Sequence, residues 1–215
     1  MVIKIALSDM VLMPSINQQY SSEQKATLLR VAAQSIQHGL ENKSPLEVYS
    51  FQYEPPLQEM RATFVTLEID EQLRGCIGML KAIKPLVEDV ASNAYSAAFR
   101  DPRFPALTKA EFNKLEIHVS ILTPAEEFPV KDEADLLQKL KPGIDGLILK
   151  DGFYQSTFLP SVWESLSSPE QFLSHLKQKA GLDTSYWSDT IAFQRYQTIA
   201  FGSTVEKIPL EKAFL

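Results

Sequence analysis

Cysteine is almost absent from this sequence of 215 residues, and Cys76 is the only one. A single cysteine cannot form a disulfide within the chain, which excludes a disulfide-stapled secreted protein and indicates a reducing compartment. Long apolar runs are also absent, because no stretch approaches the roughly 18 residues that a membrane helix needs. The apolar start, Met1 to Asp9, lacks a signal-peptide cleavage site. We therefore expect a cytoplasmic protein that does not enter a membrane.

Several common functional motifs are missing as well. The net charge is −6 and no run of five Lys or Arg occurs, so we do not expect nucleic-acid binding. There is no phosphate-binding glycine loop of the P-loop or dinucleotide type and no Gly-x-Ser-x-Gly. One cysteine and three scattered histidines do not have zinc-ligand spacing. We expect no cofactor and no metal, although a mixed His, Asp and Glu site stays open.

Hydrophobic periodicity predicts a mixture of helices and strands. Helices are expected from Ser21 to Gly39, from Pro85 to Phe99, from Thr108 over a short stretch, from Asp132 to Leu140 and from Ser168 to Ala180. Strands are expected at 62–69, 73–80, 115–122, 147–150, 153–159 and 190–201, with a strand-like start in residues 1–20. Hairpins outnumber strand–helix–strand crossovers, so the predicted class is α+β.

The first hairpin has a register that its alternation predicts. A turn centred on Glu71 places Thr66 opposite Cys76 and Glu68 opposite Arg74. The same alternation places Leu73, Ile77 and Met79 on one face, because a slip by one residue would mix the two faces.

Cys76 is the strongest candidate for chemistry, since Gly75 and Gly78 flank it and Arg74 is close by. A neighbouring guanidinium favours the reactive thiolate, and glycines let a substrate or a second backbone approach closely. The alternative interpretation is structural, because a lone cysteine in a strand is usually a small buried apolar residue.

A nucleophilic cysteine normally works with a base, and only three histidines are available. His118 is the best placed of them, on a strand face with Glu116 and Ser120. It would approach Cys76 if its strand lies directly beside residues 73–80. His38 and His175 fall within predicted helices, where surface or packing roles are more common.

Asp101-Pro-Arg-Phe104 places an acidic and a basic residue just after a predicted helix. Arg103 either binds an anionic ligand or pairs with Asp101 and locks the turn.

Together these motifs resemble one known family. Leu73-Arg-Gly-Cys-Ile-Gly78 is similar to the signature hexapeptide of the AMMECR1-domain family, and Phe64-Val-Thr-Leu67 precedes it as in that family. Ala97 to Phe104 resembles a second motif and Val119 to Pro124 a third. Asp145 to Ile148, Phe158 to Pro160 and Lys179 to Leu182 follow in family order. The resemblance covers residues 21–205, leaving 1–20 as an N-terminal extension and 206–215 as a C-terminal tail. Ser161 departs from the glutamine common at its position.

The resemblance implies an α+β fold with a large and a smaller lobe and a cleft lined by the hexapeptide. The biochemical activity of the family is not established. Prokaryotic members are associated with a Memo-like protein and a radical SAM protein in the AmmeMemoRadiSam system, which implies those two partners. This chain is not itself the radical SAM enzyme, because an iron–sulfur cluster is held by several cysteine thiolates.

Two hypotheses follow from the residues and the resemblance. In the first, the protein is an enzyme or enzyme component. Its catalytic residues are then Cys76, Arg74 and His118, and its binding residues are Thr66, Gly75, Gly78, Asp101 and Arg103. In the second, the protein is a non-catalytic ligand-binding or adaptor module, and the hexapeptide is a packing element of the hairpin.

Overall fold

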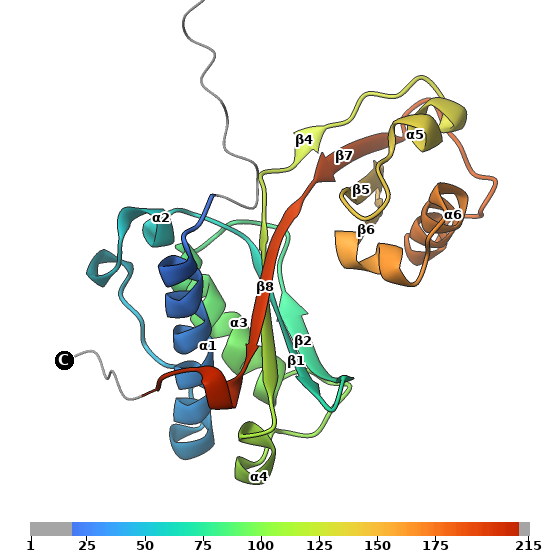
Figure 1. Ribbon diagram of the computed structural model, residues 1–215. Coiled ribbons are helices and arrows are strands. Elements are labelled where there is room, and N and C mark those ends of the chain that lie inside the picture. The colour runs from blue at the N-terminus through green and yellow to red at the C-terminus, as the bar shows by residue number, and fades with distance from the viewer. Residues whose placement is uncertain (1–18, 211–215) are drawn as a thin grey trace, which may run out of the picture.

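The computed structural model describes residues 19–210 and has an α+β fold of two antiparallel sheets flanked by helices (Figure 1). The predicted fold class is confirmed. The strand-like start predicted within residues 1–20 falls almost entirely outside the described residues, as does the end of the predicted tail, residues 211–215.

The larger lobe contains a sheet with the strand order β2-β1-β3-β8. These strands are β1 (Thr63–Ile69), β2 (Gln72–Gly78), β3 (Glu116–Leu122) and β8 (Thr198–Thr204). Two long helices, α1 (Ser22–Asn42) and α3 (Leu86–Phe99), cover one face of this sheet (Figure 1). Shorter helices, α2 (Pro55–Gln58), α4 (Lys109–Phe112), η2 (Ser50–Gln52) and η4 (Val205–Lys207), occupy the connections.

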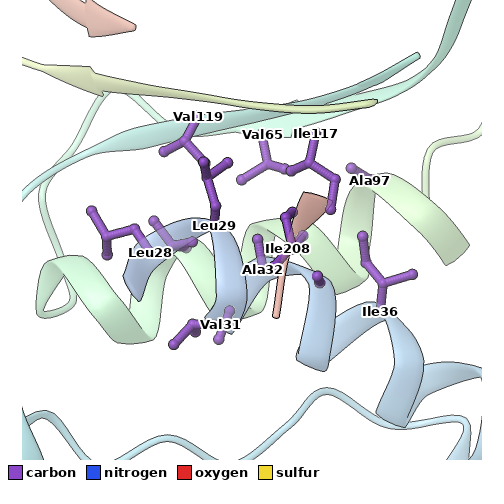
Figure 2. Packing of buried hydrophobic residues seen from close by; sticks show 14 of the residues in the cluster. Leu28, Leu29, Val31, Ala32, Ile36, Val65, Ala97, Ile117, Val119 and Ile208 are labelled. Carbon is purple, nitrogen blue, oxygen red and sulfur yellow. The ribbon is translucent and has the colours of Figure 1, made fainter. Parts of the chain in front are cut away.

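Alternation along the strands builds the core of this lobe, because every second residue faces the helices. Val65, Ile117 and Val119 are fully buried, and they meet Leu29 and other residues of α1 (Figure 2). Ile208, which lies in the segment predicted to be a tail, joins the same cluster. We call the helix-covered side of this sheet the inner face and the opposite side the outer face.

The smaller lobe contains the second sheet, with the order β4-β7-β5-β6. Its strands are β4 (Glu126–Glu127), β5 (Gly146–Asp151), β6 (Tyr154–Phe158) and β7 (Ala192–Tyr196). Helices α5 (Glu133–Lys139), η3 (Pro160–Glu164) and α6 (Pro169–Lys179) surround it. Trp163 and Phe172 stack at 3.9 Å between ring centroids and anchor a separate core.

The last predicted strand, 190–201, is wrong as a single element. Residues Ala192–Tyr196 pair within the second sheet as β7, whereas Thr198–Thr204 pair with β3 in the first sheet as β8. The chain changes sheets at Gln197, whose carbonyl oxygen accepts from the Thr123 N–H at 2.9 Å. Apolar residues recur through both strands with only Gln197 between them, so the sequence pattern alone does not show where one sheet ends and the other begins.

The first hairpin confirms one half of the predicted register and corrects the other. Thr66 lies opposite Cys76 as predicted, but Glu68 lies opposite Leu73 rather than Arg74, because Arg74 is the extra residue of a β-bulge. Downstream of the bulge the alternation changes phase. Leu73 is therefore exposed and does not share the face of Ile77, which packs against the core.

Gly75 permits the close contact between this bulge and α3. A Cβ at Gly75 would overlap the carbonyl oxygen of Ala97. We expect Gly75→Ala to lower the free energy of unfolding by about 1–3 kcal/mol, because backbone must shift to make room. Thermal unfolding followed by circular dichroism measures this as a melting temperature about 3–10 °C lower.

Glu71→Gly is the matched control, because Glu71 has a φ of 61° that glycine adopts without strain. It should unfold at or above the wild-type temperature. A Gly75→Ala protein as stable as the wild type would contradict the close packing of β2 on α3.

Candidate functional site

Cys76 is half-buried on the outer face of β2, which is an edge strand. Its register partner Thr66 points to the same face, and the Thr66 hydroxyl donates a hydrogen bond to Cys76 Sγ at 3.2 Å. The strand pairing thus places a polar donor directly against the thiol.

The backbone of Cys76 is held by the segment that follows α3. Asp101 Oδ2 accepts from the Cys76 N–H at 2.9 Å, and Arg103 Nη2 donates to the Cys76 carbonyl oxygen at 3.3 Å. The Arg103 guanidinium also donates two hydrogen bonds to the Asp101 carboxylate, from Nε at 2.9 Å and from Nη2 at 2.7 Å. We call this arrangement of Asp101 and Arg103 around the Cys76 peptide the edge clamp. The edge clamp joins the hexapeptide to the Asp101–Phe104 motif.

Asp101 and Arg103 stabilise each other's charged form in the edge clamp. The guanidinium of Arg103 holds the pKa of the Asp101 carboxyl well below its usual range, aided by the backbone N–H groups of Cys76 and Arg103. The hydrogen bond with Asp101 raises the pKa of Arg103 in return, and the charge of a Cys76 thiolate adds to that rise. About half of the Arg103 side chain is exposed, and Nη1 has no hydrogen-bond partner among residues 19–210. A cation with free donors therefore faces solvent beside the Cys76 peptide.

Arg74 has a different partner from the one that the sequence suggests. Its Nε lies 2.8 Å from Glu111 Oε1, and its Nη2 donates to the Pro105 carbonyl oxygen at 2.9 Å. These bonds tie the β-bulge to α4, and Arg74 is nearly buried in doing so. The structure therefore brings Arg103, rather than Arg74, to the charge environment of Cys76.

His118 lies on the outer face but is separated from Cys76 by β1. Both residues are register partners of Thr66, so about 9.5 Å lies between their backbones. The ring lies over Gly202 of β8, where a Cβ would overlap Nδ1, and Nε2 faces Glu116 at 3.4 Å and Glu68 at 3.5 Å. The strand of His118 therefore pairs with β1 and not with β2, and the structure does not bring His118 to the thiol.

The other two candidate residues of the hexapeptide and the remaining histidines have clear positions. Gly78 lies beneath the ring of Phe64 and has no room for a Cβ, while Gly75 touches α3 on the inner face. His38 contacts Asn42 and Ser44 on the surface of the larger lobe, and His175 is exposed on α6 of the smaller lobe.

A cleft of about 510 Å³ lies between the lobes. Its walls combine outer-face residues of the first sheet with residues of the η3 region, including Ser120, Thr198, Ala200, Ser161 and Glu164. Sequence reasoning missed most of these residues, because small hydroxyl side chains carry no distinctive signal. The one available signal was Ser161, which departs from the family pattern.

Among the described residues 19–210, no group of three or more His, Cys, Asp or Glu side chains is placed to hold a metal ion. None of the helices within that range is long and apolar enough to cross a membrane.

The Arg74–Glu111 pair makes a pH-dependent contribution to stability. Arg74 lowers the pKa of Glu111 from 4.5 to about 2, so the folded state binds this proton more weakly than the unfolded state. The stabilisation is therefore complete above pH 4.5 and is lost as the pH falls toward 2. Urea unfolding of Glu111→Gln should show a deficit relative to wild type at pH 7 that narrows steadily between pH 4.5 and 2.5.

The exposed Glu206→Gln variant serves as the control and should follow the wild type at every pH. A deficit of Glu111→Gln that stays constant from pH 7 to pH 2.5 would refute the ion-pair contribution.

Comparisons with known proteins agree with this fold. The AMMECR1 family model matches residues 29–201. Protein MJ0810 of Methanocaldococcus jannaschii is 38% identical over 72% of this chain and 82% of its own length. A protein of Methanothermobacter thermautotrophicus is 34% identical over 84% of this chain and 95% of its own.

A solved structure gives the same result in three dimensions. The uncharacterized protein PH0010 from Pyrococcus horikoshii superposes with a TM-score of 0.78 and 32% sequence identity. The match covers 89% of this chain and 97% of that one. The family suggested by the hexapeptide and its companion motifs is thereby confirmed: this chain belongs to the AMMECR1 family.

Proposed function

We propose that this protein is an enzyme or enzyme component in which Cys76 is the nucleophile. The observation that carries the proposal is the hydrogen bond from the Thr66 hydroxyl to Sγ at 3.2 Å, together with the half-exposed Arg103, whose Nη2 donates to the carbonyl oxygen of the same cysteine at 3.3 Å. A thiolate, not a thiol, is the attacking species. Hydrogen-bond donors and a nearby cation both favour the charged form.

The chemical step uses few groups. The thiol proton passes to solvent, because no histidine is within reach. The thiolate sulfur then forms a bond to an electrophilic atom of the substrate, and the leaving group departs with the electron pair of the broken bond. Arg103 Nη1 offers free donors to negative charge on that substrate. Asp101 positions Arg103 and the Cys76 peptide rather than contacting the substrate.

The other predicted residues take supporting roles in this proposal. Arg74 and Gly75 hold the β-bulge against α4 and α3, and Gly78 leaves room for Phe64. His118 presents a polar group on β3 of the same outer face, two strands away from Cys76, with Glu68 and Glu116 beside it.

Family membership supports a place in the AmmeMemoRadiSam system, with a Memo-like protein and a radical SAM protein as partners in the cytoplasm. In such a system the radical chemistry belongs to the partner, because a single cysteine cannot hold an iron–sulfur cluster. The contribution of this chain would be a two-electron thiol reaction.

A second candidate is a non-catalytic binding or adaptor module. It is favoured by one observation, namely that the hexapeptide packs tightly for structural reasons. The Cys76 peptide is fastened by Asp101, and neither Gly75 nor Gly78 has space for a side chain. In that case Cys76 is a packing residue of the sheet and takes part in no reaction.

Alkylation of the native protein by iodoacetamide at pH 7 distinguishes the two. The proposed enzyme should be modified at Cys76 in the folded state. Arg103→Gln and Thr66→Val should each slow that modification by roughly threefold or more, because both remove a group that favours the thiolate. Mass spectrometry of the single-cysteine protein gives the rates directly.

Arg61→Gln is the control, since Arg61 pairs with Glu59 at a separate site and its loss should leave the rate unchanged. A thiol that reacts only at the rate of global unfolding would support the adaptor module instead.

A further inference from the structure

One border of the first sheet is open. β8 is an edge strand, and its pairing with β3 continues into bonds from the Thr123 N–H to Gln197 O and from the Val205 N–H to Leu115 O. In an antiparallel ladder every second residue turns its N–H and C=O toward the partner strand. Starting from Gln197 and Val205, the residues that face β3 are Ile199, Phe201 and Ser203.

The alternate residues, Thr198, Ala200 and Gly202, consequently direct their backbone N–H and C=O groups away from the sheet. No turn, cap or side-chain hydrogen bond in residues 19–210 reaches these groups. The edge therefore offers three donors and three acceptors in the spacing of a β-ladder.

The other sheet borders are protected. The edge clamp occupies the Cys76 peptide on β2, Lys179 Nζ donates to the Thr157 carbonyl oxygen of β6 at 3.0 Å, and β4 consists of two exposed glutamates. Charge, proline and bulges are the usual means of blocking an edge. β8 reads Thr-Ile-Ala-Phe-Gly-Ser-Thr and has no charged residue and no proline, and its register with β3 is unbroken.

The open edge also borders the interlobe cleft. Thr198 and Ala200 contribute to its wall, opposite Ser161 and Glu164 of the η3 region. A volume of about 510 Å³ is in the range of ligand sites in proteins. A chain segment lying along β8 would thus be flanked by polar groups of the smaller lobe.

Charge indicates which segment fits. The outer face beside β8 carries Glu116, the register partner of Thr204, with Glu68 next to it, and the cleft adds Glu164. The inner side presents the half-buried ring of Phe201, with Lys25 Nζ 6.0 Å from the ring centroid, so a basic residue is disfavoured there. Side chains of an added strand alternate between these two environments. Lysine or arginine suits the outer side, and an apolar residue suits the inner side.

We propose that the edge of β8 binds an extended segment of a partner polypeptide by strand addition, with basic and apolar residues in alternation. Strand addition draws affinity from backbone hydrogen bonds and specificity from alternate side chains. The proposal goes beyond thiol chemistry at Cys76 and does not require it.

Selection from a random 12-residue phage-displayed peptide library tests the proposal. We expect enriched peptides that alternate basic with apolar residues and that bind Ala200→Pro at least tenfold more weakly than the wild type. Proline removes the outward N–H of Ala200 without removing a bond to β3. Ala200→Val keeps the N–H and is the control that should retain binding. Circular dichroism establishes that both variants are folded.

Four results would overturn the proposal. Two concern the peptides: no enriched peptide, or enriched peptides that bind Ala200→Pro as tightly as the wild type. A wild-type dimer that Ala200→Pro converts to monomer would assign the edge to a second copy of this chain. Selection that succeeds only after removal of residues 1–18 would assign it to the chain itself. Repeating the measurement in Cys76→Ala separates the two proposals, because peptide binding should persist there whether or not the thiol is reactive.

Discussion

The Asp101 carboxylate accepts four hydrogen bonds, one from the Cys76 backbone and three from the backbone and guanidinium of Arg103, while being almost fully buried. Burial of a charge is costly unless every lone pair is satisfied. The carboxylate therefore fixes three things together: the end of α3, the course of β2 and the position of Arg103. The thiol, its hydroxyl donor and its neighbouring cation all take their places from this arrangement.

Two residues of β2, Gly75 and Arg74, support this arrangement. Gly75 lets β2 approach α3, and the β-bulge at Arg74 turns that guanidinium toward Glu111 and away from the outer face. Without the bulge, Arg74 and Cys76 would share a face, and two guanidinium groups would compete for the thiol. Within the hexapeptide, Arg74 therefore has a structural role, whereas Cys76 faces the candidate site.

Local features of the sequence predicted much of this structure. The capping boxes Ser21–Gln24 and Thr108–Glu111 are both present. Thr66 pairs with Cys76 as predicted, because the extra residue of the bulge makes up for a turn that is one residue shorter than expected. The bulge was not predictable, because Asp70 and Glu71 form a tight positive-φ turn without glycine and shorten the loop.

Non-local features were not predictable for a different reason. Placing β1 between Cys76 and His118 depends on which strands pair, and alternation within one strand says nothing about its neighbours. The exchange of sheets at Gln197 and the hydroxyl-lined cleft likewise arise from tertiary packing. The cysteine alone located the candidate site. The sequence suggested Arg74 as its cation because Arg74 is close to Cys76 along the chain, whereas Arg103 is the arginine that contacts Cys76 in the fold.

The exchange at Gln197 has a mechanical consequence. Only this residue separates β7 in the smaller lobe from β8 in the larger one. It is bonded through both its N–H and its carbonyl oxygen to Thr123, in the β3–β4 connection, which is the other segment that crosses between the lobes. A hydrophobic cluster packs around this crossing, with Ala62 and Leu122 of the larger lobe against Ile148 and Tyr196 of the smaller one. A twist between β7 and β8 would open that cluster, so the crossing holds the smaller lobe at a fixed angle and sets the width of the space above the outer face.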